Sequence, residues 1–177
     1  ATDTNAIILG AATVSGTYGI TAGGAVTDSG TQEIAGVTTI SASGQTVTLN
    51  TATNNFADEV RITGAAVTVV DEDAIELGAS AVSGAYSITA GGAVTNSGAL
   101  VIPNTSTISA SGQAVTLNES SNNFGTLAIT GANVAVTDTN AIILGAATVT
   151  GTYAVTAGGA VTDSGTQEIT GVTTISA

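Results

Sequence analysis

Apolar and polar residues alternate along short stretches throughout the chain. Residues 45–49 read Gln-Thr-Val-Thr-Leu, and residues 133–137 read Asn-Val-Ala-Val-Thr. A two-residue period is that of a half-buried β-strand, and Val, Ile and Thr suit a pleated surface. Gly, Asn, Asp and Ser interrupt these runs every few residues, as turn residues do. The pattern therefore predicts many short strands and no helix.

The alternation recurs at a nearly fixed spacing. An Ile or Val followed by Thr or Ser and then a small residue begins at Ile20, Ile40, Ile62, Ile88, Ile108, Ile129, Val155 and Ile175. These positions are 20 to 26 residues apart, which predicts a unit of about 22 residues. A second row follows the first and is predicted to form a ladder of stacked core residues: Val26, Val47, Val67, Val94, Val115, Val134 and Val161.

A longer period contains these units. Residues 3–70 return as 71–137 and begin again in 138–177, which we interpret as three three-coil repeats, the last one incomplete. Residues 1–42 and 136–177 differ only at Ala1/Val136, Ser15/Thr150, Gly19/Ala154, Ile20/Val155 and Ala35/Thr170. Both ends fall inside a repeat, so we expect the chain to be part of a longer array.

Three short strands in a coil of about 22 residues predict an all-β fold, a parallel β-helix. Residues 1–177 would form one solenoid of roughly 7–8 coils, in which each coil buries its apolar face against the next. An antiparallel sandwich would not require such strict positional matching. A propeller needs blades of about 40–50 residues, usually with an aromatic signature, and this chain has three Tyr, two Phe and no Trp.

Composition restricts the partners. The 177 residues carry a net charge of −12, with Arg61 as the one basic side chain and no His, Cys, Met or Trp. Nucleic acids and anionic membrane surfaces attract basic residues, so we expect neither as a partner. No apolar stretch approaches the ~18 residues of a membrane span, so no membrane insertion is expected.

Acidic turns occupy equivalent places in the repeats: Asp3-Thr4-Asn5, Asp71-Glu72-Asp73 and Asp138-Thr139-Asn140. Carboxylate and amide oxygens are the ligands that Ca²⁺ prefers, and Asp71, Asp73 and Glu76 form the best candidate for a calcium site. Asp-x-Asn is also a common turn former. We favour the structural turn, and expect no metal and no other cofactor.

Other polar residues are also interpreted as structural. The hydroxyl rows are predicted to face outward rather than to order ice: Thr21, Ser41, Thr63, Thr89, Ser109, Thr130, Thr156 and Ser176. The pairs Asn54-Asn55 and Asn122-Asn123 are predicted to take a left-handed turn conformation and to satisfy backbone groups with their amides, rather than to contact glycans. Tyr18, Tyr86 and Tyr153 are predicted to be partly buried edge residues.

Catalysis has little support in the sequence. General acid–base chemistry usually uses His, Asp, Glu or Lys, and both His and Lys are absent. Arg61 lies close to Asp58 and Glu59, where a local ion pair is the simplest interpretation. We therefore predict no catalytic residues and no enzyme activity.

The repeats resemble those of a known family. Residues 83–98 (SGAYSITAGGAVTNSG), 115–131 (VTLNESSNNFGTLAITG) and 129–146 (ITGANVAVTDTNAIILGA) are similar to repeats of filamentous-haemagglutinin-type adhesins and related giant repetitive surface proteins of Gram-negative bacteria. The resemblance covers the whole chain. It implies a right-handed parallel β-helix, secretion to the extracellular or outer bacterial surface, and an adhesive or stalk-like role.

Three functional hypotheses follow. The first is a structural and adhesive rod segment of a large secreted or surface-anchored bacterial adhesin, whose ligands would be host or cell-surface glycans or proteins. The second is a filament subunit that associates with other copies end to end. The third, a polysaccharide-acting enzyme, would need a groove with clustered charges, which the sequence lacks.

Overall fold

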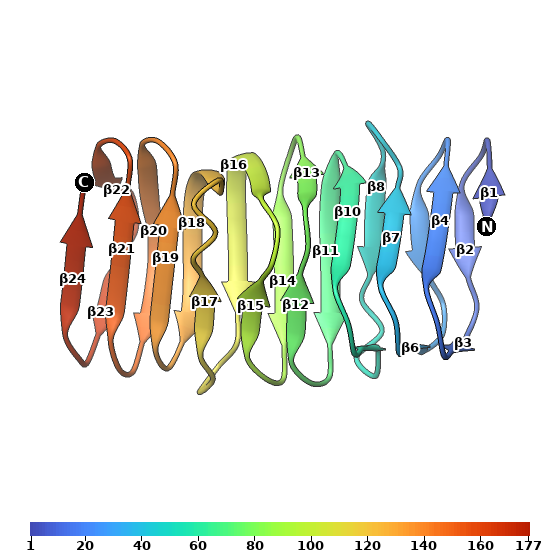
Figure 1. Ribbon diagram of the computed structural model, residues 1–177, viewed down its shortest axis with the longest axis horizontal. Coiled ribbons are helices and arrows are strands. Elements are labelled where there is room, and N and C mark those ends of the chain that lie inside the picture. Colours follow the sequence, from blue (N-terminus) through green and yellow to red (C-terminus); the bar gives the residue numbers. More distant parts are fainter.

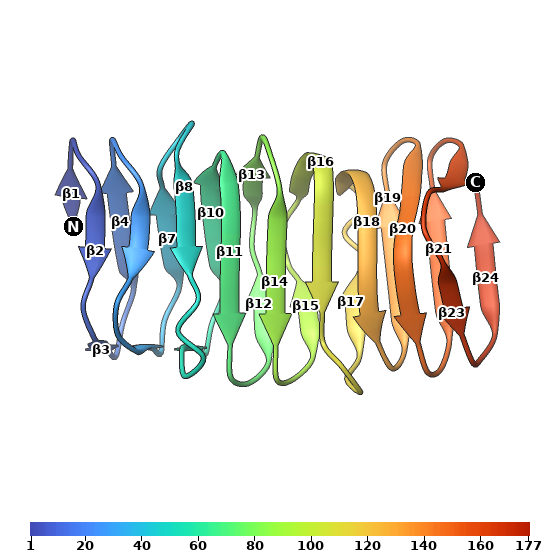
Figure 2. The same ribbon diagram turned by 180° about the vertical axis from the view of Figure 1, so that it is seen from behind.

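The predicted alternation becomes 24 strands, which pair in parallel between adjacent coils. The computed structural model describes residues 1–177 and shows an all-β parallel β-solenoid of about nine turns, with roughly 20 residues in each turn and no helix. In Figure 1 the strands nearest the viewer run upward while the chain advances from right to left, and Figure 2 shows the strands of the other side running downward. The coil is therefore right-handed. No helix is long and apolar enough to span a membrane.

Each turn of the coil is flattened and has two sides. We name the side that faces the viewer in Figure 1 side A, and the side that faces the viewer in Figure 2 side B. In most turns one longer strand covers one side, and two short strands with a bend between them cover the other.

Side A is built from these strands in order: β1 (Thr2–Asp3), β4 (Tyr18–Ala22), β7 (Thr38–Ser41), β10 (Val60–Gly64), β12 (Ile75–Leu77) with β13 (Ser80–Val82), β15 (Val94–Asn96) with the start of β16 (Leu100–Ser109), β17 (Val115–Leu117) with the start of β18 (Asn123–Gly131), β19 (Val134–Asp138), β21 (Tyr153–Ala157) and β24 (Thr173–Ser176).

Side B is built from the remaining strands: β2 (Ile7–Leu9) with β3 (Ala12–Val14), β5 (Val26–Asp28) with β6 (Gln32–Ile34), β8 (Thr46–Leu49) with β9 (Asn55–Phe56), β11 (Ala66–Asp71), β14 (Tyr86–Ala90), the later parts of β16 and β18, β20 (Ile142–Val149), and β22 (Val161–Asp163) with β23 (Gln167–Ile169). The strands β3, β6 and β9 form a small sheet of their own.

The long repeat contains a half-integer number of turns. From β1 to β10 the chain crosses seven sides, alternating between A and B, and from β11 to the end of β18 it crosses seven more. Seven sides make three and a half turns. Equivalent strands therefore change sides from one long repeat to the next: β4 lies on side A, its counterpart β14 on side B and their counterpart β21 on side A again (Figures 1 and 2).

This half turn explains why the predicted coil numbers were wrong, although the parallel β-helix was confirmed. The sequence predicted about 22 residues per coil and 7–8 coils, whereas the structure has roughly 20 and about nine. The 26-residue spacing from Ile62 to Ile88 is more than one coil, because the longer strand β11 directly follows the longer strand β10. In the structure Ile88 stacks on Val69 of the preceding coil, not on Ile62. The long repeat thus spans three and a half coils rather than three.

The predicted valine ladder is divided for the same reason. Val26, Val47 and Val67 stack on side B, and Val67 is followed by Tyr86. A second set stacks on side A: Val94, Val115 and Val134, followed by Tyr153. All six are at most 2% exposed, whereas Val161, which pairs with Ile142, is only partly buried in the last coil.

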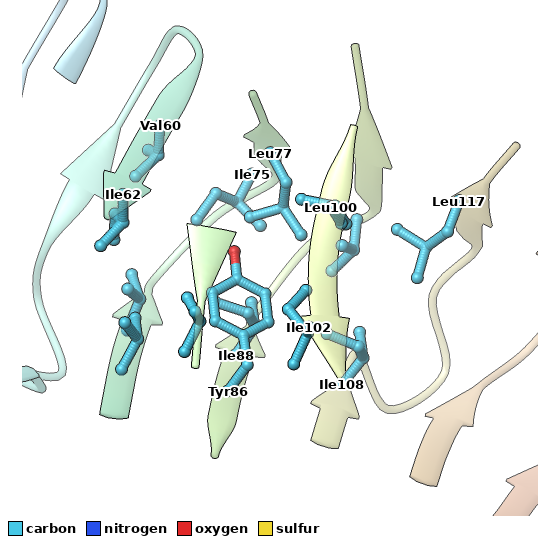
Figure 3. Packing of buried hydrophobic residues seen from close by; sticks show 14 of the residues in the cluster. Val60, Ile62, Ile75, Leu77, Tyr86, Ile88, Leu100, Ile102, Ile108 and Leu117 are labelled. Carbon is cyan, nitrogen blue, oxygen red and sulfur yellow. The ribbon is translucent and has the colours of Figure 1, made fainter. Parts of the chain in front are cut away.

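The core is continuous along the whole rod. It contains 39 buried apolar residues, mostly Ile, Val, Leu and Ala. Tyr86 and Tyr153 are 1% exposed, so their prediction as edge residues was wrong; in Figure 3 the ring of Tyr86 lies inside the coil with Ile88 and Ile102 nearby. The next coil places Ser106 over Tyr86 and Thr173 over Tyr153. These short side chains leave room for the rings.

Removing the hydroxyl of Tyr153 should not weaken the fold. This hydroxyl is buried without a hydrogen-bond partner, and burial raises the pKa of Tyr153 to about 12. An unpaired buried polar group costs roughly 1–3 kcal/mol, so Tyr153→Phe should leave the free energy of unfolding unchanged or raise it by about 1 kcal/mol. Urea titration measures this change. A loss of more than about 1 kcal/mol would mean that the hydroxyl is bonded inside the rod.

Candidate functional site

The acidic turns use their carboxylates to hold backbone groups. Asp71 is 2% exposed, and it accepts hydrogen bonds from the backbone N–H groups of Phe56 (2.8 Å) and Asp73 (2.9 Å). Asp138 is held in the same way by Phe124 (2.7 Å) and Asn140 (3.0 Å). Burial raises the pKa of both carboxyl groups, against the lowering effect of these bonds. Each aspartate closes its own turn and ties it to the previous coil.

The three candidate calcium ligands, Asp71, Asp73 and Glu76, do not point toward a common position. Asp73 is exposed, and its Oδ2 accepts a bond from Nδ2 of Asn55 (3.2 Å). Glu76 faces outward on β12, where it pairs in register with Thr95. The chain contains no group of three or more His, Cys, Asp or Glu side chains placed to hold a metal ion. With Asp71 occupied by backbone donors, the geometry favours the structural turn.

Calcium should therefore not stabilise the protein. A ligand that binds only the folded state raises the melting temperature by mass action. Because the carboxylate of Asp71 is already hydrogen-bonded, we expect no shift in the melting temperature in millimolar CaCl₂, measured by circular dichroism. A rise that Asp73→Ala removes would establish a calcium site at this turn, with MgCl₂ as the control for ionic strength.

Buried asparagines complete the bends between short strands. Asn54 is fully buried; its Oδ1 accepts from the backbone N–H of Gln32 (2.9 Å), and its Nδ2 donates to Asp28 (2.7 Å). Asn122 holds Leu100 and Asn96 in the same position of the second repeat (3.0 and 2.8 Å). These bonds replace backbone pairing where the strand bends, as predicted for the amides of the asparagine pairs. The left-handed conformation predicted for them was wrong, because no residue other than glycine has a positive φ.

The sequence did not identify Asp28 as a member of this network. Burial opposes the ionisation of Asp28, but hydrogen bonds from Asn54, Thr51 and Asn50 outweigh burial and lower the pKa of this carboxyl. The partners lie 22 to 26 residues away, so only the coil-to-coil register brings them together.

The hydroxyl rows form separate ladders on opposite sides of the rod. Three outward ladders follow from the strand register: Thr2–Thr21–Ser41–Thr63 on side A, Thr89–Ser109–Thr130–Thr148 on side B, and Thr137–Thr156–Ser176 on side A. The ladder on side A stops at Thr63 and begins again at Thr137, and the coils between carry their ladder on side B. No single hydroxyl plane therefore runs the length of the rod, which disfavours the ice-binding alternative.

The one basic side chain forms the expected local ion pair. Arg61 donates to Oε2 of Glu59 through Nε (2.8 Å) and through Nη2. This hydrogen bond raises the pKa of Arg61. Ser97 adds a bond to Oε1 of Glu59 (3.2 Å). The arginine is half exposed, and its contacts are those of a surface ion pair.

Parallel coils, a continuous apolar core and turns closed by their own side chains define a β-solenoid repeat protein. The chain belongs to a family described as repeats of unknown function (DUF5649), which matches residues 1–63, 64–130 and 131–177. These segments have the same long period as the repeats in the sequence. Neither the curated proteins nor the solved structures gave a match.

Proposed function

We propose that this segment is a stiff structural rod within a large bacterial surface protein of the adhesin type, located outside the cell. The observation that carries the proposal is the unbroken core of 39 residues along the axis. Backbone hydrogen bonds connect every coil to the next. The chain has 106 backbone–backbone hydrogen bonds in total, including a few within single turns. A shaft with this construction resists bending because any bend must separate stacked coils.

Regularity supports a mechanical role rather than a catalytic one. The polar side chains that the sequence singled out are engaged in turns, bends and a surface ion pair. Nearly identical copies succeed one another, and each adds the same length to the shaft. At about 4.8 Å per coil, three and a half turns add about 17 Å for each long repeat.

Small-angle X-ray scattering of a lengthened chain tests the rod. Ala177 occupies the repeat position of Ala42, so residues 43–177 of a second copy can follow it in phase. This extension adds two long repeats, or seven turns. We expect the rod to lengthen by about 34 Å with an unchanged cross-section. A thicker or folded-back particle would overturn the rod proposal.

A second candidate function is a filament subunit that stacks end to end. Residues 26–41 and 161–176 differ only at Ala35/Thr170, yet their burial differs greatly. Ile40 is 1% exposed beneath the next coil, whereas its counterpart Ile175 is 49% exposed. In the isolated 177-residue segment the last coil therefore presents an apolar cross-section and unpaired backbone groups, which are a template for another coil. Head-to-tail contacts of this kind propagate without closure.

We expect residues 1–177 in isolation to associate end to end, and more strongly at high salt because salt screens the net charge of −12. Light scattering measures this association. Ile175→Glu should abolish it, while the outward control Thr174→Glu, on the same strand β24, should not. A monodisperse monomer at high concentration and high salt would rule out the filament candidate. Thermal unfolding of both variants verifies that the last coils remain folded.

A further inference from the structure

A surface hollow of about 330 Å³ lies near the N-terminal end of the rod, over the small sheet β3–β6–β9, which runs along one edge between side A and side B. Figure 1 shows β3 and β6 at the lower edge of the first coils. The hollow is lined by Thr13, Val14, Ser15, Glu33, Ile34, Ala35, Asn55 and Ala57.

Strand alternation gives the hollow a polar rim. Ile34 points into the core and is 2% exposed, so Glu33, the residue before it on β6, faces outward. Register aligns Thr13, Glu33 and Asn55 on three successive coils. The hydroxyl of Thr13 donates to Oε2 of Glu33 (3.3 Å), and Asn55 is bonded to Asp73 on the next coil. The rim thus presents a carboxylate between a hydroxyl and an amide.

The floor lies two residues further along each strand. Ser15, Ala35 and Ala57 succeed one another there, because the backbone N–H of Ala35 bonds to Val14 (2.8 Å) and that of Ala57 to Ile34 (2.9 Å). Their side chains are too short to fill the space beside the rim. The hollow therefore offers one polar wall and a shallow floor of methyl, methylene and hydroxyl groups.

The other repeats contain the same place with different chemistry. Of the five differences between residues 1–42 and 136–177, two replace the floor residues Ser15 and Ala35 by the larger Thr150 and Thr170. The second repeat has a hollow of about 320 Å³ on side A, where Val101 takes the place of Glu33. The combination of an open floor and a rim carboxylate is found only in the first repeat.

The charge of the rim selects a cationic ligand. Glu33 is exposed, and the one ion pair of the chain, between Arg61 and Glu59, lies elsewhere. A volume of about 330 Å³ is at the lower end of the range for small-molecule sites, so the hollow suits one or two sugar rings. A lysine side chain would match the charge, but its four-carbon stem would leave the hydroxyl and amide of the rim unused.

We propose that this hollow binds an amino-sugar unit of a cationic polysaccharide. The ammonium group pairs with Glu33, a charge-assisted hydrogen bond that is stronger than a neutral one. Ring hydroxyls bond to Thr13, Ser15 and Asn55, and the C–H face of the ring lies on Ala35. This inference builds on the proposed adhesive rod by naming a ligand class. The experiment measures ligand binding at the hollow alone, so a negative result would leave the rod proposal intact.

The experiment is a titration of the 177-residue protein with glucosamine tetrasaccharide at mildly acidic pH, where the amines are protonated. Amide chemical shifts in ¹⁵N–¹H NMR spectra locate the binding. We expect shifts confined to residues 13–15, 33–35 and 55–57. Glu33→Gln should weaken the affinity at least about tenfold, because a hydrogen bond between charged groups is lost.

Two matched variants separate the hollow from general attraction to an acidic rod. Glu168 is the counterpart of Glu33 in the third repeat but lies in the last coil, without a covering strand, so Glu168→Gln should leave the affinity unchanged. The double variant Ser15→Thr with Ala35→Thr should abolish binding while Glu33 remains. We expect this variant to fold normally, because the third repeat carries threonine at both equivalent positions.

Several outcomes would overturn the proposal. Equal weakening by Glu33→Gln and Glu168→Gln would show non-specific attraction, and undiminished binding by the double threonine variant would place the ligand elsewhere. Equal binding of the N-acetylated tetrasaccharide would show that the ammonium group is not recognised. Tetralysine binding with the same dependence on Glu33 and the same affinity would identify a basic peptide, rather than an amino sugar, as the ligand.

Discussion

Val115→Asp should destabilise the rod by more than about 4 kcal/mol. Val115 is fully buried between Val94 and Val134 on neighbouring coils. A carboxylate at this place has no cation and no free donor near it, so it must either lose its hydration or become protonated. Unpaired buried charges are among the few single changes with effects this large. Urea unfolding followed by circular dichroism measures the loss, and Val94→Asp should behave in the same way.

The matched control is the next residue along the strand. Thr116 faces outward between Thr95 and Ala135, where water can hydrate a new carboxylate. Thr116→Asp should cost no more than about 1 kcal/mol. If the two aspartates cost the same, the inward and outward assignment of this strand would be wrong.

Gly91→Ala should cost about 3 kcal/mol, the upper end of the usual range for an overpacked position. A Cβ at position 91 would lie 2.0 Å from the backbone oxygen of Glu72 on the preceding coil. Gly23 and Gly158 have the same contact with Thr4 and Thr139, at 2.2 Å in both. The obstacle is backbone rather than a movable side chain, so the coils must separate at this turn, and overpacking of this kind is costly. Thermal and urea unfolding both measure the effect.

Gly19→Ala is the control for this prediction. Nothing lies within 4 Å of a Cβ at position 19, and the third repeat carries Ala154 at the same place. Alanine also has less freedom than glycine in the unfolded chain. We expect the stability to stay the same or to rise slightly. A large loss here, or none in Gly91→Ala, would contradict the close approach of the coils at the Gly91 turn.

The sequence predicted local features of the fold well. The alternation around Val94 and Val115 identified core residues that are fully buried, and the repeat identified parallel stacking. The side of the coil on which a strand lies was not predictable in this way. That property depends on how many half-turns precede the strand, and the direct succession of the longer strands β10 and β11 left only a widened spacing, from Ile62 to Ile88, as its signal.

Contacts between coils limited the prediction of the candidate sites. The turn formed by Asp71 was predictable because its donor on Asp73 is two residues away. Glu33 and Asn55 belong to different coils, and only their register places them on one rim. Tyr86 was assigned to the edge because its rarity along the chain suggested no stacking. Its burial depends on the small Ser106 above it, which the exact register decides.

The half-integer number of turns also governs what happens when the number of repeats changes. If one unit of about 67 residues is gained or lost, every coil beyond that point is rotated by 180° about the rod axis, and a feature that faced one surface then faces the opposite one. A change of two units shifts the same feature by seven turns, about 34 Å, and preserves its direction. Gaining or losing an even number of units thus changes only how far along the axis a feature of the rod lies. An odd number also turns the feature to the opposite surface.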